Sequence, residues 1–419
     1  MSDTGAADAI AKLRSAIFAD ASLQADLGGV AQVAAFVARL VAVAKVHNLH
    51  LDPEDLGRRL QPDPLGLSPG AAAPDLEDPA PMKGWLPVEV HQGAGGPSIE
   101  WAYFGQRPLT EPFYQDAVRS ALGTPFNRLF RLRTPLDVLP RWAAAVGDVT
   151  PNGFIFHLSR CGSTLAAQML AASPATIVLS EAAPIDALVQ LDRSAGPMPP
   201  DQRRALLRAM VCVFGQVRRG EERRYIVKLD SWHALALPLF QAAFPGTPWV
   251  FLYRDPVEVM VSQMRQRGMQ TVPAFVPPSV YGLAADSGAP AEKYCAQVLG
   301  AIGKAVPAAY ARGGGLLINY AELPEAVWRR ILPHFHIPGS DEGRRRMADA
   351  ARRDAKAPGL DFAPDVADKQ AAATGAIRAA CSAYMADIHA DLERLRRGQE
   401  RASDRAPPLG DAPARSLLS

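Results

Sequence analysis

The five residues Arg160-Cys161-Gly162-Ser163-Thr164 directly follow an apolar run and open a helical pattern. The first backbone N–H groups of a helix have no intrahelical partner, and the helix dipole favours an anion beside them. Gly162 lets the backbone pass close to such an anion, while Ser163 and Thr164 add hydroxyl donors. Arg160 adds a permanent positive charge. The stretch therefore predicts a phosphate-binding turn, with an ordinary strand-to-helix turn and a serine cap as the alternative.

This turn differs from the P-loop of nucleoside triphosphatases, which reads GxxxxGK[ST]. Phe156 or His157 stands where the first glycine belongs, and no lysine follows Gly162. The short turn suits one phosphate better than a triphosphate. The sequence also shows no convincing acidic strand for magnesium, so we expect no metal.

Short β-rich runs alternate with helical patterns from Gly153 onward. The runs read FIFHL, TIVL, YIVKL, WVFLY and LLINY. Their alternation with amphipathic helices predicts a three-layer α/β domain with a mainly parallel sheet. A helical pattern over 378–397 predicts a C-terminal helix.

Four further polar side chains lie at or directly after the ends of these runs. Ligands bind outside the carboxyl ends of the strands of an open parallel sheet, so we expect these groups to share one edge with the turn. They are Glu181, Lys228, Arg254 and Tyr320.

The rest of the chain surrounds this domain. We predict a helical N-terminal region because apolar residues recur there every three or four positions, and a linker from its Pro and Gly content. The predicted segments are a helical region at 1–65, a linker at 66–84, a mixed accessory segment at 85–150, the α/β domain at 151–400 and a disordered tail at 401–419.

Composition narrows the functional classes. The 419 residues carry a formal net charge of +2, which argues against a general nucleic-acid binder. The four cysteines have no metal-ligand spacing, so we expect reduced thiols and no zinc site. We see no secretory signal and no apolar run of transmembrane length, and therefore expect a cytoplasmic protein without a membrane partner.

From about Gly153 to Asp361, the sequence resembles the sulfotransferases that use 3′-phosphoadenosine 5′-phosphosulfate (PAPS). By this resemblance residues 160–164 hold the donor's 5′-phosphosulfate, although Cys161 replaces the serine usual in the family. The family's second motif is an arginine at a strand end with a serine eight residues later, both reaching the 3′-phosphate. Arg254 and Ser262 match it, and a helix starting at Pro256 would place Ser262 two turns on.

The resemblance assigns three further positions within a P-loop-like sulfotransferase core. Lys228 matches a strand lysine near the transferring sulfuryl group, and Glu181 lies where tyrosylprotein and some carbohydrate sulfotransferases carry a catalytic glutamate. Tyr320 resembles a residue near the donor nucleotide. Arg160 and Lys228 would then stabilise negative charge during transfer.

The sequence departs from the family in two places. Asp230 stands where cytosolic sulfotransferases have a catalytic histidine, and His233 lies at a different offset, so Glu181, Asp230 and His233 compete as the general base. The family's downstream basic loop is absent, which leaves Arg353 or Lys356 to complete the 3′-phosphate site.

Each candidate also has a structural interpretation, and the two stay open here. Glu181 could cap a helix starting at Pro184, and Lys228 could pair with a carboxylate. Arg254 could pair with Asp255. Asp230 and His233 could anchor a following helix. His157 and Cys161 are interpreted as packing residues.

We therefore expect a sulfotransferase that moves a sulfuryl group from PAPS to a hydroxyl of a small-molecule acceptor. A nucleotide-dependent kinase of related fold and a non-catalytic nucleotide-binding protein are the alternatives. The Pro-rich stretch 271–290 is either a lid over the acceptor or a surface loop. The acceptor, the oligomeric state and the role of residues 1–150 are open.

Overall fold

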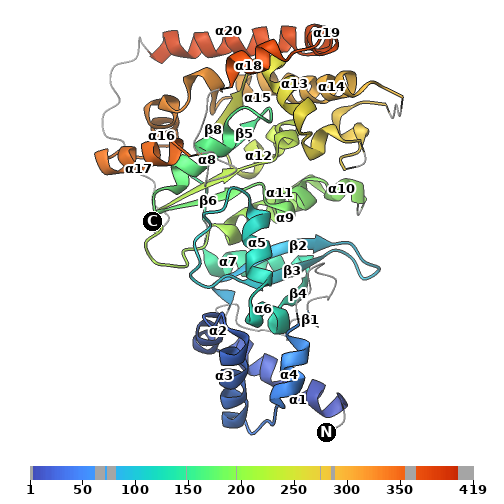
Figure 1. Ribbon diagram of the computed structural model, residues 1–419, viewed down its shortest axis with the longest axis vertical. Coiled ribbons are helices and arrows are strands. Elements are labelled where there is room, and N and C mark those ends of the chain that lie inside the picture. The colour runs from blue at the N-terminus through green and yellow to red at the C-terminus, as the bar shows by residue number, and fades with distance from the viewer. Residues whose placement is uncertain are drawn as a thin grey trace. The chain divides into compact units, whose positions relative to one another are not determined.

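A computed structural model of the chain describes residues 3–61, 71–72, 82–147, 149–194, 196–273, 275–284, 288–353 and 365–403. The chain divides into two compact units (Figure 1). Unit 1 comprises Met1–Val149 and Ala182–Glu221, and unit 2 comprises Thr150–Glu181 and Glu222–Ser419. The predicted domain at 151–400 included residues 182–221, which this division groups with unit 1. The segment boundaries drawn from the sequence remain a prediction.

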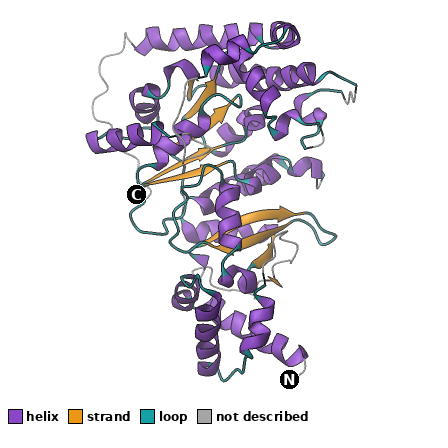
Figure 2. Cartoon of the chain, in the orientation of Figure 1, coloured by secondary structure: helices purple, strands orange, loops and turns teal. Residues whose placement is uncertain are grey.

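Unit 1 begins with the four helices of the N-terminal region, drawn in purple in Figure 2. They are α1 (Asp3–Ala19), α2 (Ala21–Gly28), α3 (Val33–Val46) and α4 (Pro53–Arg59). Aspartates cap two of them, because Asp20 accepts backbone N–H bonds at the start of α2 and Asp52 does so at the start of α4. The predicted helical N-terminal region is confirmed.

A small sheet follows in unit 1, with the strand order β1-β4-β3-β2. Its strands are β1 (Ala71–Ala72), β2 (Trp85–His91), β3 (Ser98–Tyr103) and β4 (Leu132–Pro135). The unit's other helices are α5 (Tyr114–Leu122), α6 (Pro125–Phe130), the short 3₁₀-helix η2 (Leu136–Val138), α7 (Leu139–Val146), α9 (Ala183–Val189), α10 (Leu191–Ser194) and α11 (Pro200–Phe214). Trp85, Tyr103 and Phe126 pack ring against ring in its core.

Unit 2 is built on a five-stranded sheet in which every pairing is parallel. The strands are β5 (Gly153–His157), β6 (Thr176–Ser180), β7 (Arg224–Lys228), β8 (Trp249–Tyr253) and β9 (Gly315–Asn319), in the order β6-β7-β5-β8-β9. They coincide with the five β-rich runs of the sequence. Because β5 lies at the centre and the chain continues to both sides of it, the carboxyl end of β5 is the expected place for a ligand.

The side chains of β5 point alternately to the two faces of the sheet, and helices cover both faces, so unit 2 has three layers. Ile155 packs in a core cluster with residues of α8 (Ser163–Ala171) on one face. Phe154 and Phe156, whose side chains point the other way, make ring contacts with Phe240 of α12 (Leu237–Ala243). The predicted three-layer α/β fold is confirmed.

The remaining elements of unit 2 follow β7 and β8. The α-helices are α13 (Pro256–Arg265), α14 (Ala291–Lys304), α15 (Val306–Ala311), α16 (Leu332–His334), α17 (Asp341–Ala351), α18 (Val366–Ala371), α19 (Gly375–Tyr384) and α20 (Ala386–Ser403). Shorter helical turns are η3 (Ser231–Ala236), η4 (Met269–Thr271), η5 (Pro278–Tyr281), η6 (Tyr320–Glu322) and η7 (Val327–Ile331). Within the described residues, no helix has both the length and the apolar character needed to cross a membrane.

The C-terminal helix differs from its prediction. Instead of one helix over 378–397, α19 ends at Tyr384 and α20 starts at Ala386. The break packs closely on α14, where a Cβ on Gly300 would lie 2.4 Å from the Tyr384 carbonyl oxygen. The first residues of the predicted tail, 401–403, belong to α20, and 404–419 lie outside the described residues.

Candidate active site

The turn between β5 and α8 has an unusual backbone. Ser159, Arg160 and Gly162 have φ angles of 73°, 53° and 83°, all in the left-handed region. Such a conformation costs a residue other than glycine about 1–3 kcal/mol, so it persists only where surrounding contacts hold it. Gly162 is also needed for space, because a Cβ there would lie 2.6 Å from Leu323 Cδ1 and 2.8 Å from Tyr320 Cδ2.

Helix α13 holds this turn through two hydrogen bonds. Gln263 Nε2 donates to Ser159 Oγ at 3.0 Å, and Arg160 Nε donates to Ser262 Oγ at 2.8 Å. Gln263 is fully buried, and its Oε1 accepts from the Gly268 N–H at 2.8 Å. The structure thus joins the two motifs, since Ser262 of the second one contacts Arg160 of the first. Gln263 was not identified as a site residue from the sequence, although its position next to Ser262 could have indicated it.

The start of α8 fits the anion interpretation better than the serine-cap alternative. Gly162 is the N-cap residue and has no side chain that could cap the helix, so no serine caps it from that position. Ser163 and Thr164, which open it, are both buried. Cys161 is also buried with its Sγ 3.1 Å from the Leu252 carbonyl oxygen, and burial raises the pKa of its thiol to about 11. A thiol that stays protonated at neutral pH fits its interpretation as a packing residue.

Glu181 and Lys228 form a charged pair at the ends of β6 and β7. Lys228 Nζ donates to Glu181 Oε1, and the lysine is fully buried while the Glu181 side chain is 21% exposed. Burial alone would raise the pKa of Glu181, but the charge of Lys228 and the nearby His157 outweigh it and hold that pKa well below its usual range. Glu181 is therefore ionised at neutral pH.

The sequence left a structural alternative open for each residue of this pair, a helix cap for Glu181 and a carboxylate partner for Lys228. Glu181 does not cap the next helix, because α9 has Ala182 at its N-cap and no side-chain cap bond within the described residues. Instead Glu181 has a left-handed φ of 52°, a strained conformation of the kind that clusters at functional sites. Lys228 does pair with a carboxylate, and the carboxylate is the other catalytic candidate.

His157, interpreted from the sequence as a packing residue, also faces this pair. Its Nδ1 accepts the Ser159 N–H at 3.0 Å, so the neutral ring carries its proton on Nε2. Nε2 lies 3.2 Å from Glu181 Oε1, at an angle short of a directed hydrogen bond. Burial lowers the pKa of His157, which favours the neutral ring. The signal for its role was its place as the last residue of β5.

The other base candidates anchor a helical turn. Asp230 is the N-cap residue of η3, and its backbone N–H donates to His233 Nδ1 at 3.3 Å. The two residues form a capping box, which is the structural interpretation of this pair. Among the three candidates, Glu181 is the one that pairs with the strand lysine Lys228.

Arg254 lies at the end of β8 and is buried. Its Nε donates to Glu258 at 2.5 Å and its Nη2 to Asp365 at 2.9 Å, while its guanidinium stacks 3.8 Å from the centre of the Tyr320 ring. The suggested Arg254–Asp255 pair is wrong, because Asp255 instead accepts two backbone N–H bonds at the start of α13. Tyr320 thus lies beside Arg254, as the sequence predicts for two side chains at one edge of the sheet.

A buried lysine that the sequence analysis missed lies in the same place. Lys369 of α18 is 5% exposed, and its Nζ lies 2.7 Å from Asp365 Oδ2. The sequence predicts that Arg353 or Lys356 completes the 3′-phosphate site. Arg353 is exposed after α17, and Lys356 lies outside the described residues. The only sequence signal was a helical Asp–Lys pair four residues apart.

Helix α20 fixes the strand ends that carry Arg254 and Tyr320. Glu393 accepts a hydrogen bond from Tyr253 Oη at 2.6 Å and one from Asn319 Nδ2 at 2.8 Å, and it pairs with Arg396. Burial would raise the pKa of Glu393, but these three donors lower it to about 2. Tyr253 and Asn319 directly precede Arg254 and Tyr320, so the network orients both.

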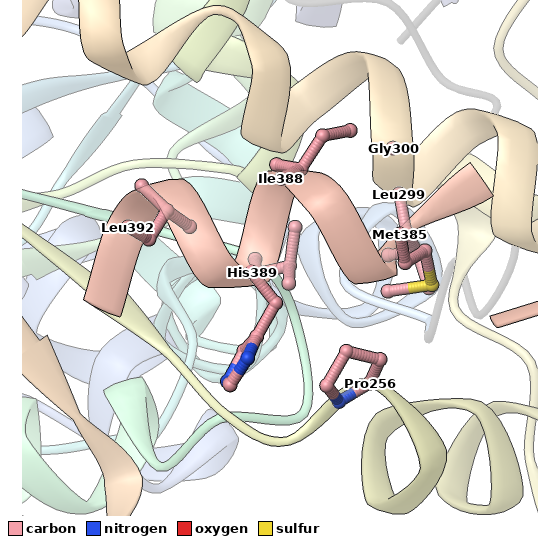
Figure 3. A pocket seen from close by; sticks show the side chains of 8 residues that line it. Pro256, Leu299, Gly300, Met385, Ile388, His389 and Leu392 are labelled. Carbon is pink, nitrogen blue, oxygen red and sulfur yellow. The ribbon is translucent and has the colours of Figure 1, made fainter. Parts of the chain in front are cut away.

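A cavity between α14 and α20 is a different feature (Figure 3). His389 is its one ionisable lining group, and the rest of the lining is apolar or glycine. It is therefore not where an anion binds. The lining residues are Leu158, Pro256, Leu299, Gly300, Met385, Ile388, His389 and Leu392.

Comparison with known proteins points the same way as the motifs. Residues 151–281 match the model of the Sulfotransferase family. No curated protein sequence matches the chain.

The chain is also similar to solved sulfotransferase structures, and each of the following three matches covers 56% of this chain. The sulfotransferase domain from the curacin biosynthetic pathway is 16% identical over 97% of that chain, with a TM-score of 0.37. Sulfotransferase STF9 from Mycobacterium avium is 15% identical over 74% of that chain, with a TM-score of 0.36. STF1 from Mycobacterium tuberculosis H37Rv is 19% identical over 79% of that chain, with a TM-score of 0.33. Scores this low assign no residue roles.

The family match spans the turn at 160–164, Glu181, Lys228, Arg254 and Ser262. Residues 151–281 thus match the Sulfotransferase family, and they include strands β5 to β8 of the parallel five-stranded sheet.

Proposed function

We propose that the protein transfers a sulfuryl group from PAPS to a hydroxyl group of a small-molecule acceptor. One observation carries the proposal: the Arg160–Ser262 hydrogen bond joins the turn expected to hold the 5′-phosphosulfate to the helix expected to hold the 3′-phosphate. A donor with phosphates at both ends of one nucleoside matches two anion sites linked in this way.

The residues present fit such a donor. At the 5′ end, a helix start with a glycine N-cap, a left-handed turn and Arg160 converge, which is the chemistry of a phosphate cradle. At the 3′ end, Arg254 and Lys369 supply two buried cations. The donor supplies the activated sulfuryl group, and the protein supplies position and charge.

Lys228 and Glu181 are the proposed catalytic pair. Transfer of a sulfuryl group resembles phosphoryl transfer, in which negative charge spreads over the transferring oxygens and cations stabilise it. Glu181 is ionised and can accept the acceptor's proton, a contribution worth about 10²–10⁴ in rate. While Lys228 holds it, Glu181 is a weak base. When Lys228 turns toward a more negative group, the pKa of Glu181 rises and the carboxylate becomes a better base.

The proposal includes a cytoplasmic location and no metal. None of the four cysteines forms a disulfide and all four are buried, as is ordinary in a reducing compartment. The kinase alternative lacks a Walker lysine after Gly162. The non-catalytic alternative would keep the donor site and lose nothing when Glu181 is changed.

Thermal melting tests the donor site directly. We expect adenosine 3′,5′-bisphosphate at 100 times its dissociation constant to stabilise the protein by about 2.7 kcal/mol. ATP with magnesium should shift the melting temperature much less. A shift with ATP and magnesium alone would overturn the proposal in favour of the kinase.

A further inference from the structure

The carboxylate of Asp365 bridges the two buried cations at the 3′ end of the proposed donor site. Its Oδ1 accepts from Arg254 Nη2 at 2.9 Å, and its Oδ2 lies 2.7 Å from Lys369 Nζ. One oxygen for each cation is the arrangement that a phosphate group would adopt between the same two side chains.

Arg254 has a second carboxylate partner, and the two partners differ. Glu258 comes from α13, one helical turn after Arg254, and its side chain is 8% exposed. Asp365 comes from a distant part of the chain, and its side chain is 39% exposed. Glu258 is therefore a built-in partner that orients the guanidinium, whereas Asp365 is the more exposed partner and the easier one for a ligand to displace.

Charge decides which anion the two cations prefer. A carboxylate brings one negative charge, whereas a phosphate monoester carries about −1.5 to −2 at neutral pH and three acceptor oxygens. A 3′-phosphate therefore outcompetes Asp365, but part of its binding free energy goes into separating Asp365 from Arg254 and Lys369.

We propose that Asp365 is an internal competitor that occupies the anion position between Arg254 and Lys369, and that a nucleotide's 3′-phosphate must displace it. This inference rests on the proposed function and extends it. Asp365 weakens the binding of every nucleotide that carries a 3′-phosphate. It thereby speeds the release of the bisphosphate that remains after sulfuryl transfer. Lys369 becomes a binding residue for the same phosphate.

Equilibrium titration of the full-length protein tests this with two probes, adenosine 3′,5′-bisphosphate and adenosine 5′-monophosphate. We expect D365N to bind the bisphosphate about fivefold more tightly, the size of a half-exposed ion pair. The monophosphate, which has no 3′ anion, should bind D365N and the unaltered protein equally. K369M should weaken the bisphosphate only.

D368N is the matched control, because Asp368 is exposed on the same helix and its change alters the net charge equally. Its bisphosphate affinity should stay that of the unaltered protein. Asp365→Ser serves as a second variant, so that the test does not depend on the folding of one asparagine substitution.

Unchanged or weaker bisphosphate binding in folded D365N and Asp365→Ser would overturn the inference, as would an equal gain for the monophosphate. The unaltered protein separates this failure from a failure of the proposed function. If it binds neither nucleotide, the proposed function falls, and this inference falls with it.

Discussion

Both ends of the candidate site hold buried cations beside carboxylates, but different elements of the fold supply these residues. At the proposed sulfuryl end, Lys228 is the last residue of β7, Glu181 directly follows the neighbouring strand β6, and the lysine is fully buried. At the proposed 3′-phosphate end, Arg254 directly follows β8, but Asp365 and Lys369 come from a late helical segment. The sheet fixes the spacing of the strand ends that carry the first pair, whereas the position of Asp365 and Lys369 depends on how their helical segment packs.

Substitution of Lys228, the fully buried lysine, should have the largest effect on the free energy of unfolding. Lys228→Met leaves Glu181 without its cation, and breaking a buried pair from one side costs about 3–5 kcal/mol. Lys369→Met leaves the more exposed Asp365, so we expect a loss of about 1 kcal/mol or less. Denaturant unfolding measures both. Equal losses in the two variants would contradict the distinction between the two ends. Adding Glu181→Gln to Lys228→Met should restore part of the stability, because it removes the carboxylate charge that Lys228→Met leaves without a cation.

Arg254→Ala should separate the ends by ligand. We expect about a hundredfold weaker binding of adenosine 3′,5′-bisphosphate, as for truncation of a buried charged contact. The 5′-monophosphate should lose much less. Arg160→Ala, at the other end, should weaken both nucleotides by similar factors. Titration calorimetry gives the two ratios, and a uniform loss in Arg254→Ala would remove the assignment of the 3′ end.

Gln263→Leu should loosen the turn that joins the ends. It removes the donor to Ser159 and the acceptor for the Gly268 N–H, at a cost of about 2 kcal/mol for buried groups left unpaired. Both nucleotides should then bind less tightly, because the left-handed turn loses its support. Gln266→Leu, at the exposed C-terminal end of α13, is the control. If Gln263→Leu matches Gln266→Leu, the turn is held by other contacts.

Glu393→Gln should give the smallest effect, visible mainly in its pH dependence. The pKa of Glu393 is lowered to about 2 in the folded protein, below its usual 4.5. Its contribution is therefore present above about pH 4.5 and is lost as the pH falls toward 2. The stability difference between Glu393→Gln and the unaltered protein should shrink as the pH is lowered from 6 to 3. A difference that stays constant would exclude this role for the carboxylate.

The same contrast explains what the sequence alone could predict. All five strands of unit 2 were predicted, because apolar runs and amphipathic helices fix a parallel sheet locally. Parallel strands end at one edge, so the local pattern was enough to place Glu181, Lys228 and Arg254 together. Their roles in the reaction remain predictions.

What could not be predicted depends on long-range packing. Asp365 lies 111 positions after Arg254, and no local pattern connects them. The same holds for Gln263, whose partner Ser159 is 104 positions earlier. The family resemblance suggested Arg353 or Lys356 as the cation that completes the 3′-phosphate site, a role that we propose for Lys369. The local pairing of Arg254 with Asp255 was wrong because Asp255 instead caps the helix that its neighbour Pro256 begins.

Transfer of label from a ³⁵S-labelled donor tests the central claim most directly. The full-length protein is incubated with labelled PAPS and a panel of small phenols and alcohols, beside Glu181→Gln and Arg254→Ala. The account predicts labelled product with the unaltered protein, a rate lower by about 10² or more with Glu181→Gln, and loss of donor binding with Arg254→Ala. Transfer of ³²P from γ-labelled ATP, with none from the sulfate donor, would contradict it.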